Sequence, residues 1–304
     1  MLESKLCINN INKSTPEKLS EFKLSEKYAT SKVGYSLNRV CRLQGLYGER
    51  LALKIKGRKQ SYLAKLIQPG YSGSRHLHFI AMFSWISQTP MQSLFLHPKE
   101  LPHHWGKLDE FSCDTITFCG ILPQEIFIGL MQIFCGMSET KKHPRTQLVE
   151  SLIQALSEYE DEMFMAPNEI DYDKFGRDYN RAVAGGLKRM RTEKNFAHSD
   201  MMEVFYVDRI TYDVYENPYR DHYLPIEFGR RLQLGFNIES SVDFVVDMRT
   251  YTKFIVARKV QDLRVKIIAA IFYQLPSDLT RWFREFAEQT MYQFLGKDKT
   301  NTDI

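Results

Sequence analysis

One short segment of this sequence combines basic and aliphatic side chains at alternate positions. The basic residues are Arg50, Lys54, Lys56 and Arg58. The aliphatic residues are Leu51, Leu53 and Ile55. Guanidinium and ammonium groups donate hydrogen bonds to phosphate oxygens and to the acceptor atoms of guanine, so this spacing suits contact with nucleic acid.

Alternation with a period of two is typical of a β-strand, in which successive side chains point to opposite faces. The segment 50–58 is therefore predicted to be a strand with one basic face and one aliphatic face. The simplest alternative is an amphipathic edge strand whose lysines only discourage pairing with another sheet.

Two short helices are predicted after this strand. Residues 60–67 carry leucine and isoleucine at helical spacing, residues 68–73 contain proline and glycine and form a turn, and a second apolar stripe begins at Leu77. Strand, helix and helix in this order are the elements of a ribbon-helix-helix unit, in which two protomers pair their strands into a ribbon that enters the major groove. The sequence therefore predicts a homodimer on double-stranded DNA.

The predicted site follows from this arrangement. The basic face and the start of the second helix supply the expected DNA contacts, which are Arg50, Lys54, Lys56, Arg58, Lys59, Ser72, Ser74 and Arg75. The aliphatic face packs the ribbon onto its helices through Leu51, Leu53 and Ile55.

The distribution of charge agrees with an acidic partner. The net charge of the chain is +4, but residues 1–100 carry 16 Lys and Arg against 6 Asp and Glu, a balance of +10. Nucleic acid is the commonest partner of such a basic region, and a solvated basic surface is the alternative.

The rest of the chain reads as a mixture of helices and strands. Buried or β-rich segments predict strands at 112–122, 204–215 and 243–254. Helical spacing predicts helices at 124–135, 146–165, 256–275 and after Pro276. The expected fold is α+β, with an N-terminal arm at 1–35, a ribbon-helix-helix-like unit at 36–90 and an α+β dimerisation or regulatory domain at 91–304.

Two further patterns suggest other chemistry. Arg191 and His198 are seven residues apart, a spacing that resembles the Arg-to-His motif of HEPN ribonucleases, where the pair assists cleavage of RNA. A nuclease using this pair, or a non-catalytic interaction module, is therefore an alternative to a DNA-binding regulator. His76 and His78 form a His-x-His pair, but on a helix their side chains would diverge, and no metal site is predicted.

Composition bounds the remaining possibilities. Five cysteines without a Cys-x-x-Cys pair argue against a disulfide framework or a zinc ribbon. The first residues lack the apolar core of a signal peptide, and the one long apolar segment, at 118–137, is interrupted by polar residues and glycine. We expect a cytoplasmic protein with no membrane partner and no cofactor, and no enzymatic activity.

The segment Leu-x-Leu-Lys-Ile-x-Gly-Arg at 51–58, the following Pro-Gly-Tyr-x-Gly at 69–73 and the overall length resemble the AcaB-type regulators of conjugative plasmids and integrating conjugative elements. The resemblance covers about 40 residues. It implies a dimeric ribbon-helix-helix protein that activates transfer genes. RNA polymerase or a co-regulator is then a further expected partner.

Overall fold

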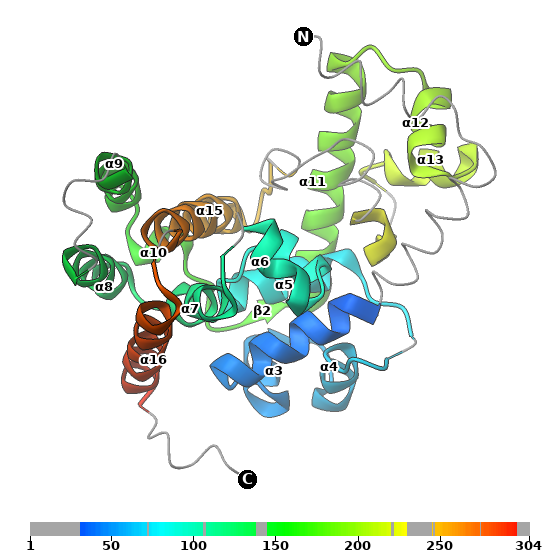
Figure 1. Cartoon of the computed structure of the whole chain (residues 1–304). Coiled ribbons are helices and arrows are strands. Elements are labelled where there is room, and N and C mark those ends of the chain that lie inside the picture. Colours follow the sequence, from blue (N-terminus) through cyan, green and yellow to red (C-terminus); the bar gives the residue numbers. More distant parts are fainter. Residues whose placement is uncertain are drawn as a thin grey trace.

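The computed structural model describes residues 31–71, 73–105, 108–137, 145–219, 222–229, 245, 247–273 and 275–296. Helices dominate this part of the chain (Figure 1). Its only named strands are β1 (Ile55–Lys56) and β2 (Ile170–Asp171), which pair in parallel. The expected α+β fold with a ribbon-helix-helix unit is therefore wrong.

The N-terminal region is built from short helices. A helix over residues 31–44 precedes α3 (Gly48–Lys54), and β1 and α4 (Gln60–Leu66) follow. Next comes α5 (Leu77–Ser87), which is buried on nearly every side. Short turns of helix complete the region, namely η1 (Met91–Phe95), η2 (Pro98–Glu100) and α6 (Leu101–His104).

The segment predicted as a basic strand is mostly helix. Residues 49–54 read Glu-Arg-Leu-Ala-Leu-Lys, and each of these is a strong helix former. Leu51 and Ile55 are buried four positions apart, whereas Leu53 is 67% exposed. The assignment of Leu53 to a ribbon-packing face is therefore wrong, because the buried positions follow the helical period and not the strand period.

The second half of the molecule packs around α15 (Thr252–Phe272). Its neighbours are α7 (Glu110–Gly120), α8 (Gln124–Met137), α9 (Arg145–Ser157) and α10 (Asp161–Phe164). Helix α16 (Ser277–Phe294) lies against α7. The helices expected at 124–135, 256–275 and after Pro276 are confirmed. The helix expected at 146–165 is two helices, α9 and α10, and the strand expected at 112–122 is α7.

The long helix α11 (Tyr172–Glu193) extends from the end of β2 toward α12 (His198–Phe205) and α13 (Arg209–Tyr215) (Figure 1). Asp171 starts α11 as its N-cap, because its carboxylate accepts a hydrogen bond from the backbone N–H of Lys174. The strand expected at 204–215 is wrong, since this segment forms the end of α12 and all of α13. The sequence also predicts a strand at 243–254, but the described residues of this segment contain none.

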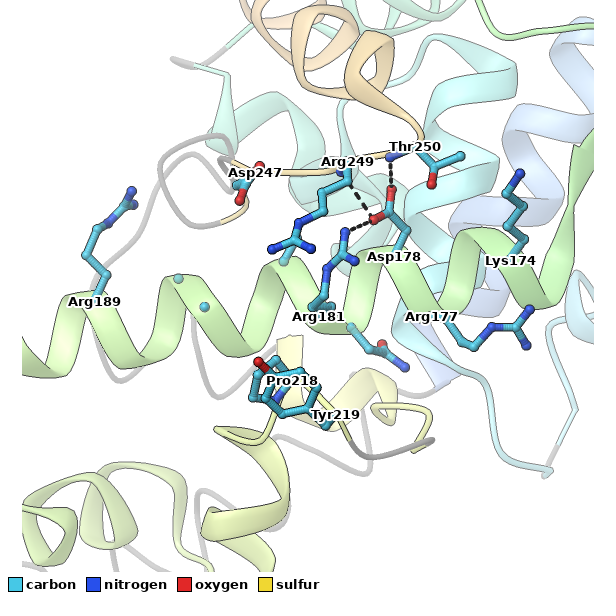
Figure 2. A pocket seen from close by; sticks show the side chains of 14 residues that line it. Lys174, Arg177, Asp178, Arg181, Arg189, Pro218, Tyr219, Asp247, Arg249 and Thr250 are labelled. Carbon is cyan, nitrogen blue, oxygen red and sulfur yellow. Dashed lines mark hydrogen bonds and ion pairs between the residues drawn. The ribbon is translucent and has the colours of Figure 1, made fainter.

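One carboxylate joins α11 to the start of α15. Asp178 is 5% exposed and accepts hydrogen bonds from the backbone N–H groups of Arg249 and Thr250, at 3.2 and 2.8 Å (Figure 2). It accepts a third from the backbone N–H of Tyr251, at 3.1 Å. It also forms an ion pair with Arg181 at 2.5 Å. Asp178 therefore satisfies three successive backbone donors that lead into α15.

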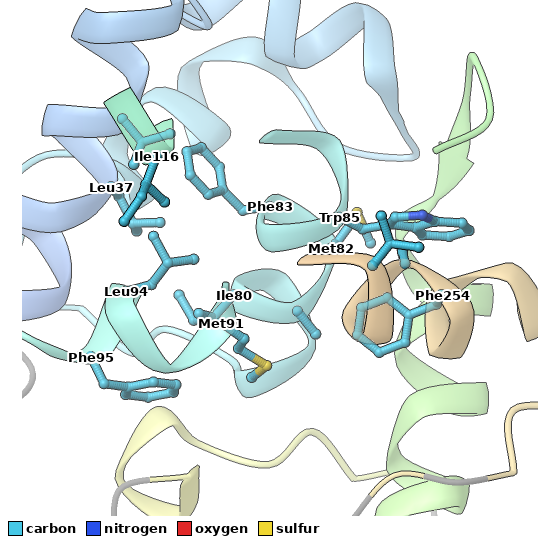
Figure 3. Packing of buried hydrophobic residues seen from close by; sticks show 14 of the residues in the cluster. Leu37, Ile80, Met82, Phe83, Trp85, Met91, Leu94, Phe95, Ile116 and Phe254 are labelled. Atoms are coloured by element: carbon cyan, nitrogen blue, oxygen red, sulfur yellow. The ribbon is translucent and has the colours of Figure 1, made fainter. Parts of the chain in front are cut away.

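A single hydrophobic core runs through the described helices. Figure 3 shows Phe83, Trp85 and Ile80 of α5 among side chains from several other elements. The Trp85 ring lies 5.7 Å from that of Phe254 on α15, and its indole N–H donates to the carbonyl oxygen of Phe164 at 2.7 Å. Helix α5 is thus the element on which the N-terminal helices and α15 meet.

Candidate helix-turn-helix surface

Helices α3 and α4 pack against each other and are joined by the connection 55–59. Gly57 lies in this connection with φ of +87°, a left-handed conformation that favours glycine. Leu51 of α3 and Leu63 and Leu66 of α4 are buried. Two short helices joined by a glycine-containing connection resemble a helix-turn-helix, whose second helix enters the major groove of DNA, although this connection also contains strand β1.

The exposed side of α4 carries polar side chains. Gln60, Ser61 and Lys65 are exposed, whereas Leu63 and Leu66 are buried on the opposite side. A Cβ atom added at Gly48 would lie 3.2 Å from the Gln60 amide nitrogen, so this side chain sits beside the start of α3. Glutamine can form two hydrogen bonds with adenine, and serine and lysine suit bases or phosphates. Sequence reasoning missed Gln60 and Ser61 because it placed the reading face on a strand at 50–58 and not on the helix that follows.

The predicted DNA contacts are only partly at this surface. Arg50, Lys56, Lys59 and Ser74 are exposed, and Lys54 is half-buried. Ser72 lies outside the described residues. Arg50 and Lys54 are on α3, while Lys56 and Lys59 are in the connection, so the cations surround the two helices and do not form one face of a strand.

Arg58 is held by another part of the chain. Its guanidinium donates to both oxygens of Asp173 on α11, at 2.9 and 2.5 Å, and lies 4.3 Å from the centre of the Tyr172 ring. The hydroxyl of Tyr223 donates to the same carboxylate at 2.5 Å. The structure thus places Arg58 in an intramolecular ion pair that ties the connection between α3 and α4 to the start of α11.

Arg75 is a structural residue. Its side chain is 1% exposed and donates to the carbonyl oxygens of Leu66, Gln68 and Tyr71, at 2.8, 2.6 and 3.3 Å. These are carbonyls at and after the end of α4, which have no partner within the helix. The structure thus turns Arg75 inward, where it fixes the C-terminal end of α4, and not outward toward a phosphate.

His76 and His78 lie side by side. His76 is the extended residue before α5, so the divergence expected of two helical positions does not apply, and the two rings stack with their centres 5.4 Å apart. His78 is fully buried between Tyr172 and Tyr223, with both ring nitrogens unpartnered among the described residues. Burial, followed by the influence of His76, lowers the pKa of His78 to about 3.

This buried histidine predicts an acid-sensitive fold. In the unfolded chain His78 has a pKa of about 6.5, so between about pH 6.5 and 3 only the unfolded state binds the proton. Stability is therefore lost as pH falls through that window, by about 2–3 kcal/mol between pH 6.5 and 4.5. His78→Leu is expected to remove this contribution to the pH dependence of the free energy of unfolding. Urea unfolding at several pH values measures the effect. His103→Leu, at an exposed position, is the control, and an unchanged pH slope in His78→Leu would contradict the prediction.

Arg191 and His198 converge on one acidic side chain. Arg191 donates from Nε and Nη2 to Glu216, at 3.0 and 2.9 Å, and His198 Nε2 lies 3.5 Å from the same carboxylate. His198 Nδ1 is also 3.4 Å from Asp213. The two residues lie on α11 and α12, not on one helix face, and their side chains contact acids that join α11, α12 and α13.

The described residues contain no group of three or more His, Cys, Asp or Glu side chains that could hold a metal ion. The cysteines at 41, 113, 119 and 135 are free thiols. No helix in the described ranges is long and apolar enough to cross a membrane. No protein-family model, curated protein or solved structure matches this chain.

Proposed function

We propose that this chain binds duplex DNA in a sequence-specific manner through the helix-turn-helix formed by α3 and α4. The observation that carries the proposal is that α4 has two distinct faces. One face is exposed and polar, with Gln60, Ser61 and Lys65, and the other is buried through Leu63 and Leu66. In such units the residues at the start of the second helix contact base edges, while the first helix lies across the backbone.

The surrounding charges support the same orientation. Arg50 on α3 and Lys56 and Lys59 in the connection are exposed near the two helices, where phosphates would lie on either side of the groove. Contacts to phosphate position the protein, and contacts from α4 to base edges select the sequence. We further propose that the protein acts as a homodimer and has the regulatory role implied by the AcaB-type resemblance. Two copies of α4 one helical turn apart, about 34–36 Å, would read a palindromic site.

Selection of bound sequences from random duplex DNA, followed by titration across salt concentrations, tests the proposal. Gln60→Ala is expected to weaken binding to the selected site by about 1–3 kcal/mol and to relax the preference at one base pair. Lys65→Ala is expected to weaken all duplexes alike and to reduce the salt slope by about 0.9. Fluorescence anisotropy measures both effects.

Lys259→Ala removes an equivalent exposed charge from α15 and is the matched control, which is expected to bind as the unaltered protein does. Two results would overturn the proposal. One is the absence of any enriched sequence. The other is a Gln60→Ala variant with unchanged affinity and unchanged base preference.

A further inference from the structure

A second basic surface lies along α11, outside the helix-turn-helix. It lines an open pocket of about 870 Å³ between α11, the turn at Pro218 and Tyr219, and the segment 247–250. Figure 2 shows Arg181 and Arg249 near the middle of this pocket, with Lys174 and Arg189 toward its two ends. The volume falls within the range of ligand-binding pockets, about 300–1,000 Å³.

The charges of this pocket are unbalanced. Its basic residues are Lys174, Arg177, Arg181, Arg189 and Arg249. Its acids are Asp178 and Asp247, and Asp178 is already occupied by Arg181 and three backbone N–H groups. Arg189 forms an ion pair with Glu193 at 3.7 Å, whereas Lys174, Arg177 and Arg249 form no ion pair within the described ranges. The five basic residues against two acids therefore leave the lining with an excess of positive charge.

The basic side chains form a row. Lys174, Arg177, Arg181 and Arg189 follow one side of α11 and span 15 residues, which at 1.5 Å per residue is about 22 Å. Most neighbours in the row are about one helical turn apart. A single phosphate would contact only one or two of these groups, whereas a chain of phosphates could extend along the whole row.

Gly185 interrupts this row in the middle of the pocket. It is exposed, and nothing lies within 4 Å of a Cβ atom added at this position. Neither packing nor backbone conformation therefore requires glycine here, although glycine in a helix interior is destabilising relative to alanine. Its effect is to leave the helix surface open to close approach by a ligand.

An exposed aromatic ring faces the row across the pocket. Tyr219 is 93% exposed, and its backbone N–H donates to the side-chain oxygen of Asn217 at 2.9 Å, which holds the turn (Figure 2). A ring beside a row of cations is the combination by which proteins bind single-stranded nucleic acid, since bases stack on the ring while phosphates meet the cations.

We propose that this groove binds single-stranded nucleic acid. The phosphodiester chain follows Lys174, Arg177, Arg181 and Arg189, and a base stacks on Tyr219. Arg249 reaches the strand from the opposite wall. The site is separate from α3 and α4, so the proposal does not depend on duplex reading by the helix-turn-helix.

Fluorescent oligothymidylate and oligouridylate of about 12 nucleotides test this groove by anisotropy. Tyr219→Ala is expected to weaken the affinity for the strand by about 5- to 150-fold, the equivalent of one lost stacking contact. Arg177→Ala combined with Arg249→Ala is expected to lower the salt slope by about 1.4, or about 0.7 per lost phosphate contact. Preference for one of the two probes would show whether the groove selects DNA or RNA.

Gly185→Gln distinguishes a binding role from a structural one. It places a side chain in the open part of the groove, so we expect weaker binding of the strand with an unchanged or raised thermal midpoint. Gln60→Ala, in the helix-turn-helix, is expected to leave binding of the strand unchanged, and Gly185→Gln to leave duplex binding unchanged. Binding of neither probe would overturn the proposal, as would Tyr219→Ala and Gly185→Gln variants that bind as the unaltered protein does.

Discussion

Replacement of Arg75 by leucine is expected to lower the free energy of unfolding by about 3–5 kcal/mol. The guanidinium is buried and donates to three carbonyl oxygens at the end of α4, and leucine would remove one donor from each of them. The Gln68 carbonyl would keep another donor, the backbone N–H of Tyr71. Urea unfolding followed by circular dichroism measures the loss.

Arg75→Lys is the matched control. An ammonium group retains the charge but cannot span the separate carbonyls of Leu66 and Gln68 as the planar fork does, so an intermediate loss is expected. Because Arg75 fixes the end of α4, the leucine variant is also expected to bind duplex DNA more weakly under conditions where it remains folded. Stability equal to that of the unaltered protein would show that the arginine is dispensable.

Asp178→Ala is expected to cost a similar amount, about 3–5 kcal/mol. The carboxylate is the acceptor for the N–H groups of Arg249, Thr250 and Tyr251 and the partner of Arg181, and all four lose their acceptor together. Hydrogen exchange is expected to increase most at the start of α15. The unfolding midpoint in urea measures the global effect.

Asp178→Asn separates charge from hydrogen bonding in this junction. Asparagine keeps one acceptor oxygen but loses the attraction to Arg181. The free energy of unfolding of Asp178→Asn is therefore expected to lie between that of the unaltered protein and that of Asp178→Ala. If the alanine variant unfolds at the same urea concentration as the unaltered protein, the junction between α11 and α15 does not depend on this carboxylate.

Helices with a clear apolar stripe could be predicted from the sequence. Those at α4, α5, α15 and α16 are present where the spacing of leucine, isoleucine and aromatic residues indicated them. Residues 51–55 were misread because Leu51, Leu53 and Ile55 fit a period of two, while Leu51 and Ile55 alone fit a helix. The helix formers around them decide between the two patterns.

A largely buried helix that is rich in β-branched residues is harder to recognise. Helix α7 contains Thr115, Ile116 and Thr117, which are all buried and which favour strands in local statistics. Helix α5 is buried at least as fully but carries leucine, alanine and methionine, which favour helices, whereas the β-branched residues of α7 give a strand signal. Packing against α15 and α16 overrides that preference.

The two helices of the candidate helix-turn-helix surface could have been predicted from the sequence. Leu51, Ile55, Leu63 and Leu66, with Gly57 between the two pairs, are the buried and turn positions of two short helices. In contrast, the roles of Arg58 and Arg75 depend on what lies beside them in space. The carboxylate that engages Arg58 is 115 residues away, and no local pattern indicates it.

That separation along the chain has a consequence for folding during synthesis. Strand β1 and Arg58 find their partners, β2 and Asp173, only after residues 170–173 have been made. At about 5–20 residues per second, the ribosome takes roughly 6–23 s to add the intervening 115 residues. During that interval the nascent α3 and α4 lack the contacts that anchor their connection, so this pair of helices is completed only after its later partners have been translated.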